Sequence, residues 1–119
     1  MPHLILEASA NLQESNERLQ HVLSSCQNIL VDGLSTQLSS CKSRLIMCEV
    51  FIVGDGEPNK AFLHLTVKAL KKPDRTPELL KSISEKLQQE IINNCARSMS
   101  QQKVGVSVEI VELHSSYTQ

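Results

Sequence analysis

The chain has 119 residues, 40% of them hydrophobic and 21% charged, which suits one globular domain with a modest core and is too short for two. A formal net charge of −1 and an aromatic content of 3% exclude the basic patch and the stacking side chains of nucleic-acid binders. The longest apolar run, residues 45–53, is too short to span a bilayer.

The first part of the chain is predicted to be a strand followed by a helix. Residues 3–8 form a short apolar-rich strand, and from Asn11 onward the apolar residues recur at helical spacing. Asn11 with Glu14 resembles a helix-capping pair, and Gly33 comes directly after the periodic positions as a helix stop. The apolar face of this helix consists of Leu19, Val22, Leu23, Cys26, Ile29 and Leu30.

The middle of the chain is predicted to contain two strands. Residues 35–40 are polar and form a loop, and residues 45–53 form a nearly continuous apolar strand, as expected when both of its faces are covered. Residues 54–59 have the glycine, aspartate, proline and asparagine of a turn. Residues 61–69 then alternate apolar and polar side chains. The simplest arrangement of the two strands is a hairpin or a neighbouring pair.

The last part of the chain repeats the helix and the strand. A charged loop at residues 71–74 precedes Thr76 and Pro77, which begin a second helix. Residues 104–111 alternate as a final strand, and the polar tail at 114–119 is expected to fray. The second helix has an apolar stripe of Leu80, Ile83, Leu87, Ile91 and Cys95.

The predicted order of elements is two β-α-β units. We therefore expect an α+β fold: a single domain of residues 1–119, with pseudo-repeats at about 2–53 and 60–113, whose four-stranded mixed sheet has both helices on one face. The other face would carry apolar residues from 45–53, so we expect an oligomer. The ferredoxin-like fold has the same order of elements and stays open as an alternative.

Metal chemistry finds no support in the sequence. The four cysteines and four histidines are scattered, without a C-x-x-C pair or the clustered spacing of zinc ligands. We interpret the cysteines as reduced thiols and expect no metal. Since no signal peptide is readable, we also expect a cytoplasmic protein that contacts neither membrane nor nucleic acid.

Pro2 is the candidate catalytic group. Small second residues, proline included, generally permit removal of the initiator methionine, which would leave Pro2 as a secondary amine. A terminal amine has an ordinary pKa of about 7.7–8.0, and burial with nearby cations lowers it. A neutral amine on a rigid strand can take a proton from one carbon and return it to another.

Three cations are placed to assist such a base. Lys42 and Arg44 come just before the predicted second strand, and Arg75 comes just before the second helix. Ends of elements are where a β-α topology gathers functional groups. Cations there would hold substrate carboxylates and stabilise a developing enolate.

Pro2, Lys42 and Arg44 lie in segments that follow a known pattern: residues 1–7 (MPHLILE), 42–44 (KSR), 55–56 (DG), 61–66 (AFLHLT) and 107–110 (SVEI). Together these segments resemble the 5-carboxymethyl-2-hydroxymuconate isomerases of the tautomerase superfamily. The resemblance covers nearly the whole chain in order and at matching spacing.

The resemblance implies a homotrimer with active sites at subunit boundaries and with no metal or organic cofactor. It implies that Pro2 is the general base and that Lys42, Arg44 and Arg75 bind the carboxylates of a small-molecule substrate. The chain departs from the family at Lys42, often an arginine, which loses bidentate carboxylate recognition. It also has Lys60 where an aromatic residue is familiar, and a longer loop before Arg75.

The leading hypothesis is therefore a tautomerase that moves a proton within an unsaturated keto or enol (di)carboxylic acid, in the catabolism of aromatic compounds. One alternative is a non-catalytic trimeric binding or scaffold protein of the same fold. Another is a different proton-transfer or hydration activity of the superfamily. His64 is predicted to be structural, with a place in the site as the alternative. Glu7 and Glu109 receive no role.

Overall fold

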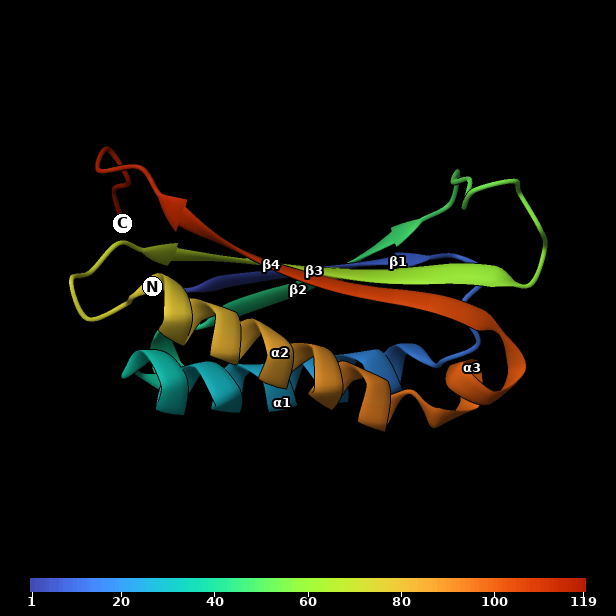
Figure 1. The fold of residues 1–119 in the computed structure, drawn as a ribbon, viewed down its shortest axis with the longest axis horizontal. Coiled ribbons are helices and arrows are strands. Elements are labelled where there is room, and N and C mark those ends of the chain that lie inside the picture. The colour runs from blue at the N-terminus through green and yellow to red at the C-terminus, as the bar shows by residue number, and fades with distance from the viewer.

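A computed structural model describes residues 1–119 as one twisted sheet with helices packed on one side of it (Figure 1). No helix is both long enough and apolar enough to cross a membrane. The elements in chain order are β1 (His3–Ser9), α1 (Asn16–Leu34), the short 3₁₀ helix η1 (Leu38–Ser40), β2 (Lys42–Cys48), β3 (Lys60–Leu70), α2 (Pro77–Asn94), α3 (Ala96–Gln101) and β4 (Lys103–Leu113).

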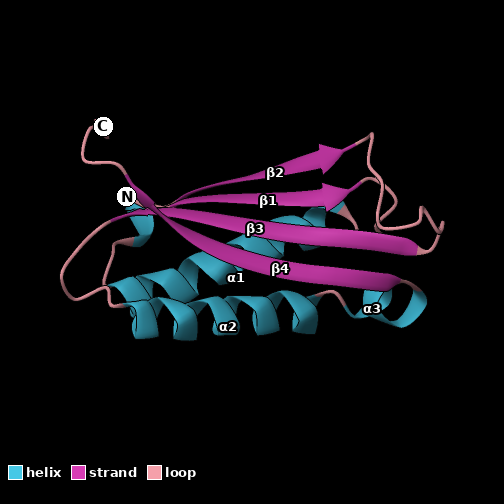
Figure 2. Cartoon of the chain, turned by 45° about the horizontal axis from the view of Figure 1, so that its top comes forward, coloured by secondary structure: helices cyan, strands magenta, loops and turns pink.

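The sheet has the strand order β2-β1-β3-β4. Within each half the two strands are parallel neighbours, and β1 runs antiparallel to β3 at the centre. The predicted four-stranded mixed sheet with both long helices on one face is confirmed (Figure 2). Because the strands of each unit are adjacent, the arrangement is not the split β-α-β of the ferredoxin-like fold.

The predicted pairing of the second and third strands is wrong, because β1 lies between them. The crossover through α1 returns β2 beside its own parent strand, which makes β2 an edge of the sheet. Residues 49–59 must therefore pass the end of β1 to reach β3. Two bonds fasten them there: Ala10 N donates to the Cys48 carbonyl at 3.0 Å, and Asn11 Nδ2 donates to the Lys60 carbonyl at 2.8 Å.

The start of α1 differs from its prediction. Ser15 is the N-cap, and its hydroxyl accepts a hydrogen bond from Arg18 N at 3.0 Å. Glu14 instead accepts a bond from Ser98 N at 2.8 Å, in the first turn of α3, a helix that the sequence did not predict. The helix also continues one residue beyond Gly33, and Ser35 takes the left-handed conformation that ends it.

The second strand begins earlier than predicted and ends earlier. β2 covers Lys42–Cys48 rather than residues 45–53, because its register with β1 runs from His3 opposite Lys42 to Ser9 opposite Cys48. Beyond Ser9 there is no strand left to pair with. Lys42 and Arg44 consequently lie within the sheet, and residues 50–53 lie in a loop.

One hydrophobic core of 19 buried residues fills the space between the sheet and the helices. Alternate residues of β1 and β3 point into it, while the residues between them lie on the face without helices, which we call the open face. The largest fully buried side chains from these two strands are Leu4, Leu6, Leu63, Leu65 and Val67. From the helices they are Leu19, Val22, Leu30, Ile83, Leu87 and Ile91.

Gly33 is required for the contact between the two long helices. A Cβ placed there would lie 2.9 Å from Cδ1 and 3.0 Å from Cγ1 of Ile83 in α2, closer than carbon atoms approach one another. The residue that resembled a helix stop is therefore a packing residue.

We expect Gly33→Val to lower the free energy of unfolding by about 2 kcal/mol, because the branched side chain must push Ile83 out of its place. Ser24→Val, at an exposed position of the same helix, should cost about 0.5 kcal/mol or less, from helix propensity alone. Urea denaturation measures both. Equal losses of unfolding free energy in the two variants would show that the close approach of the two helices does not depend on the missing side chain at Gly33.

Candidate active site

The beginning of the chain lies in the middle of one end of the sheet. His3 is in register with Lys42 on one side and with Lys68 on the other. Pro2 is fully buried, and its carbonyl accepts a hydrogen bond from Lys42 N at 3.1 Å. Both ends of the chain lie at this end of the sheet (Figure 2).

The terminal amine, which in this structure is that of Met1, lies in positively charged surroundings. Burial lowers its pKa most, followed by the charges of Arg75, Lys72 and Lys42, while Cys41 acts in the opposite direction. None of these cations forms an ion pair: the only ones in the chain involve Lys60, His64 and Lys103. The structure thus brings Pro2, Lys42 and Arg75 together around uncompensated positive charge, which suits a carboxylate ligand.

Arg75 is nearly inaccessible, with 6% of its surface exposed. Its Nη1 donates to the Leu70 carbonyl at 2.7 Å and its Nη2 to the Leu34 carbonyl at 3.1 Å, at the ends of β3 and α1. A cation at the carboxyl end of a helix is favoured by the helix dipole. Its Nε is buried without a partner. Arg75 is therefore fixed by backbone groups that use two of its five N–H groups, and its charge is not cancelled by a carboxylate.

Lys42 and Arg44 lie on the open face, and both are exposed. Arg44 Nη1 is 3.3 Å from His3 Nδ1, and His3 Nε2 is 2.8 Å from the Tyr117 hydroxyl. The His3 and Tyr117 rings meet edge to face, with centroids 5.9 Å apart. Burial and the surrounding cations, Arg44 foremost, lower the pKa of His3.

The predicted fraying of the tail is wrong, because Tyr117 N bonds to the His114 carbonyl at 2.9 Å and the tyrosine ring contacts His3. Neither His3 nor Tyr117 was predicted as a site residue. One signal was available: the last strand of a second β-α-β unit ends where the first strand begins, if the two central strands are antiparallel. The only tyrosine of the chain follows that strand.

His64 lies on the open face in a network of its own. Its Nδ1 is 2.6 Å from the Ser107 hydroxyl and its Nε2 is 3.0 Å from Glu109, which also accepts a bond from Thr66 at 3.3 Å. The bond with His64 holds the pKa of Glu109 below its ordinary value. Since the partners of both ring nitrogens, Ser107 and Glu109, lie in β4, the network joins β3 to β4.

The open face is more polar than predicted. Ile46 is the one residue of the segment 45–53 that lies exposed on it within β2, and it is 46% exposed. The other apolar side chains of that segment that are most exposed, Val50 at 97% and Ile52 at 82%, project from the loop after the strand. The two most exposed apolar side chains thus lie in the loop after β2, while Val111 is a smaller exposed apolar group at the chain-start end of the open face.

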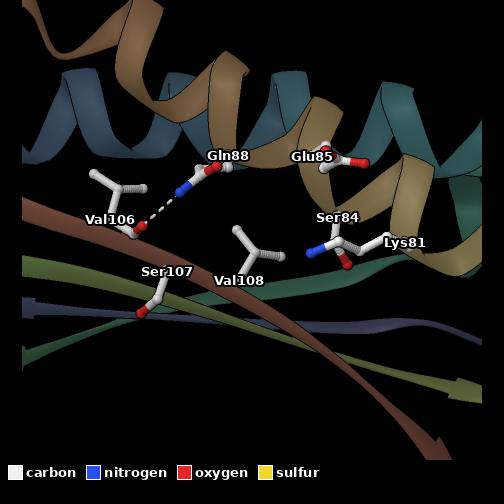
Figure 3. Close-up of a pocket in the computed structure, with 7 residues that line it drawn as sticks. All are labelled: Lys81, Ser84, Glu85, Gln88, Val106, Ser107 and Val108. Atoms are coloured by element: carbon white, nitrogen blue, oxygen red, sulfur yellow. Dashed lines mark hydrogen bonds between the residues drawn. The ribbon is translucent and has the colours of Figure 1, made fainter.

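The most clearly formed hollows of the surface lie away from the chain start. Figure 3 shows a shallow hollow between α2 and the edge strand β4, where Gln88 donates to the Val106 carbonyl at 2.9 Å and Ser107 points away from the helix. None of the predicted site residues lines it, nor do they line four further hollows of 220–380 Å³. The candidate site is open on a single chain.

The model of the 5-carboxymethyl-2-hydroxymuconate isomerase family matches residues 2–119. The chain belongs to this family. No protein in a search of curated sequences matches it.

Solved structures of this isomerase family and of the tautomerase superfamily have the same fold. A 5-carboxymethyl-2-hydroxymuconate isomerase from Deinococcus radiodurans R1 superposes with a TM-score of 0.83 at 25% identity, over 99% of this chain and 87% of that one. A 5-carboxymethyl-2-hydroxymuconate delta-isomerase gives a TM-score of 0.80 at 15% identity, over 100% and 87%. A macrophage migration inhibitory factor-like protein from Entamoeba histolytica gives 0.68 at 12%, over 94% and 88%. Membership in the family makes the chain an isomerase.

The electrostatics of the chain start predict a measurable change in the pKa of the terminal amine. Lys72→Met should raise this pKa toward its ordinary value, because the positive charge of Lys72 disfavours the protonated amine. The matched control is Lys81→Met, which removes an exposed lysine of α2 that is not among the groups shifting the amine. The pH dependence of acylation at the terminal amine measures the pKa. A shift of the same size in both variants would contradict the assignment.

Proposed function

We propose that the protein, once Met1 is removed, moves a proton within an unsaturated keto or enol (di)carboxylic acid with Pro2 as the general base. The observation that carries this proposal is the lowered pKa of the amine at the chain start, that of Met1, which directly precedes the buried Pro2 and is influenced by the charges of Arg75, Lys72 and Lys42. A lowered pKa increases the neutral fraction of such an amine, and the neutral form is the one that acts as a base. The match of the family beginning at Pro2 supports the same assignment.

The proposed reaction needs no covalent intermediate. The Pro2 nitrogen takes a proton from the carbon next to the substrate carbonyl, which gives a dienolate and a protonated secondary amine. The cations around the chain start stabilise the negative charge on the dienolate oxygen. The same amine then returns the proton to a distant carbon, so that the double bond moves and the amine is neutral again.

Three cations share the remaining work in this proposal. Arg44, exposed on the open face, offers the planar fork that binds a carboxylate in a bidentate manner, and Lys42 offers a point charge beside it. Arg75 contributes its charge from within the fold, because two of its nitrogens are already bonded to backbone carbonyls.

We also propose a homotrimer in which a second copy completes the site. The support is the open site of the single chain, together with the large exposed fractions of Val50 and Ile52, which a partner would cover. A neighbour of the same fold is described as a symmetric trimer of fused 4-OT, at 16% identity, a TM-score of 0.65 and coverage of 92% of this chain and 85% of that one.

A cytoplasmic role in the catabolism of aromatic compounds completes the proposal. The four free thiols suit a reducing compartment.

Replacement of Pro2 tests the base. In protein shown by intact mass to begin at residue 2, Pro2→Ala should lower kcat for ketonisation of phenylenolpyruvate by about 10- to 100-fold, because a primary amine remains but the ring no longer orients it. A variant with glycine inserted before Pro2 should lose turnover completely, since its proline nitrogen is an amide.

Pro58→Ala, in the exposed loop after β2, is the matched control and should leave kcat unchanged. Unchanged turnover in both chain-start variants would remove Pro2 from the mechanism. Retention of Met1 in the protein isolated from its natural source would favour the non-catalytic binding alternative.

Light scattering tests the oligomer. The chain mass is 13.2 kDa, so we expect a species of three times that mass. The double variant Val50→Asp with Ile52→Asp should shift it toward the monomer, because two charges would be buried against the partner. Asn28→Asp, on the exposed side of α1, should not. A monomeric wild-type protein would contradict the trimer.

A further inference from the structure

We propose that His3 and Tyr117 are positioning residues that hold the guanidinium of Arg44 ready for the substrate carboxylate. This inference rests on the function proposed above, because it takes Arg44 as a carboxylate-binding group. It adds to that site two residues that act through Arg44, one from each end of the chain. Two hydrogen bonds in series carry it: Arg44 Nη1 to His3 Nδ1 at 3.3 Å, and His3 Nε2 to the Tyr117 hydroxyl at 2.8 Å.

The direction of the hydrogen bonds follows from the chemistry of the groups. A guanidinium only donates, so His3 Nδ1 must accept, and the imidazole must be neutral. The ring hydrogen is then on Nε2 and is donated to the oxygen of Tyr117. The tyrosine therefore selects the tautomer that Arg44 needs, in the way that a second partner usually fixes a histidine ring.

The surroundings of His3 keep it neutral. The charged groups that face it are Arg44 and Lys42 from β2 and Lys68 from β3, joined by the terminal amine whenever that amine is protonated. Together with burial they lower its pKa, so protonation is resisted near neutral pH. No carboxylate lies among the groups that shift His3.

Tyr117 is held in place by its own segment of chain. Its ring meets the imidazole edge to face, with an interplanar angle of 79°. The tail folds back through the bond from Tyr117 N to the His114 carbonyl at 2.9 Å, and Ser116 bonds to the His114 ring at 2.8 Å. The two ends of the chain, 114 residues apart, thus meet above the start of β1.

The neutral acceptor leaves the arginine free to bind an anion. Arg44 forms no ion pair, and the imidazole occupies one of its five N–H groups without cancelling its charge. A carboxylate in the place of His3 would orient the guanidinium equally well but would neutralise it. Orientation without neutralisation reduces the entropy that is lost when a substrate carboxylate binds.

Kinetics of the full, processed chain test the inference. Tyr117→Phe keeps the ring and removes the hydroxyl, and His3→Leu removes the acceptor. Each should raise KM for phenylenolpyruvate about fivefold and leave kcat within about twofold, because the loss falls on substrate binding. His3→Gln, which retains an acceptor oxygen for Arg44, should recover most of the loss. The double variant Tyr117→Phe with His3→Leu should have the same KM as His3→Leu alone, since Tyr117 acts on Arg44 only through His3. We call this pair of hydrogen bonds, Arg44 to His3 and His3 to Tyr117, the relay.

The tautomer gives an independent spectroscopic readout. In ¹⁵N-histidine-labelled protein, His3 Nε2 should carry the hydrogen and Nδ1 should not. A hydrogen on Nδ1, or an unchanged KM in both single variants, overturns the inference.

Binding of cinnamate, an unreactive carboxylate, separates this inference from the proposed function. If Pro2→Ala lowers kcat while Tyr117→Phe changes neither KM nor the Kd of cinnamate, the relay is wrong and the function stands. If Pro2→Ala has no effect while Tyr117→Phe weakens cinnamate binding about fivefold, the relay stands and the proline base is wrong.

Discussion

The pairing of β1 with both of its neighbours is the constraint on which the rest of the structure depends. Because β1 is parallel to β2 and antiparallel to β3, the beginning of the chain is surrounded by strands. The same register sets Lys42 and Lys68 on either side of His3, and it brings the end of β4 to the same place through the pairing of Lys68 with Val111. Pro2 is thereby buried, and the terminal amine before it is held in positively charged surroundings.

Burial and charge act on the terminal amine in the same direction, which is uncommon at a chain end. Desolvation disfavours the protonated amine, and Arg75 and Lys72 disfavour it further. The fold accommodates this concentration of like charge in two ways. Arg75 donates hydrogen bonds to the Leu34 and Leu70 carbonyls, while Lys42 and Arg44 are exposed to solvent. A bound carboxylate would relieve the repulsion that remains.

Periodicity predicted the two long helices and the four strands, and the buried faces of both helices and of β3, because local pattern decides them. It placed Arg75 correctly before α2, since Thr76 and Pro77 are strong local start signals. Periodicity misplaced the start of β2, because that boundary depends on pairing with a distant strand. Residues 42–44 are polar and were placed before the strand, but they belong to it through their pairing with β1. The contact of His3 with Tyr117 spans 114 residues and leaves no local signal in the sequence.

The two arginines of the candidate site show how burial divides similar groups between different tasks. Arg75 is almost inaccessible, so water and salt screen its charge weakly and its influence on the nearby amine is strong. Arg44 is exposed, so its charge is screened, but its N–H groups are available to a ligand. The basicity of the amine is therefore set from within the fold, and recognition of the substrate belongs to the open face. Substitution of Arg44 can then alter the choice of substrate without changing the base, because Arg44 is not among the charges that shift the amine and its contacts share no hydrogen bond with those of Arg75.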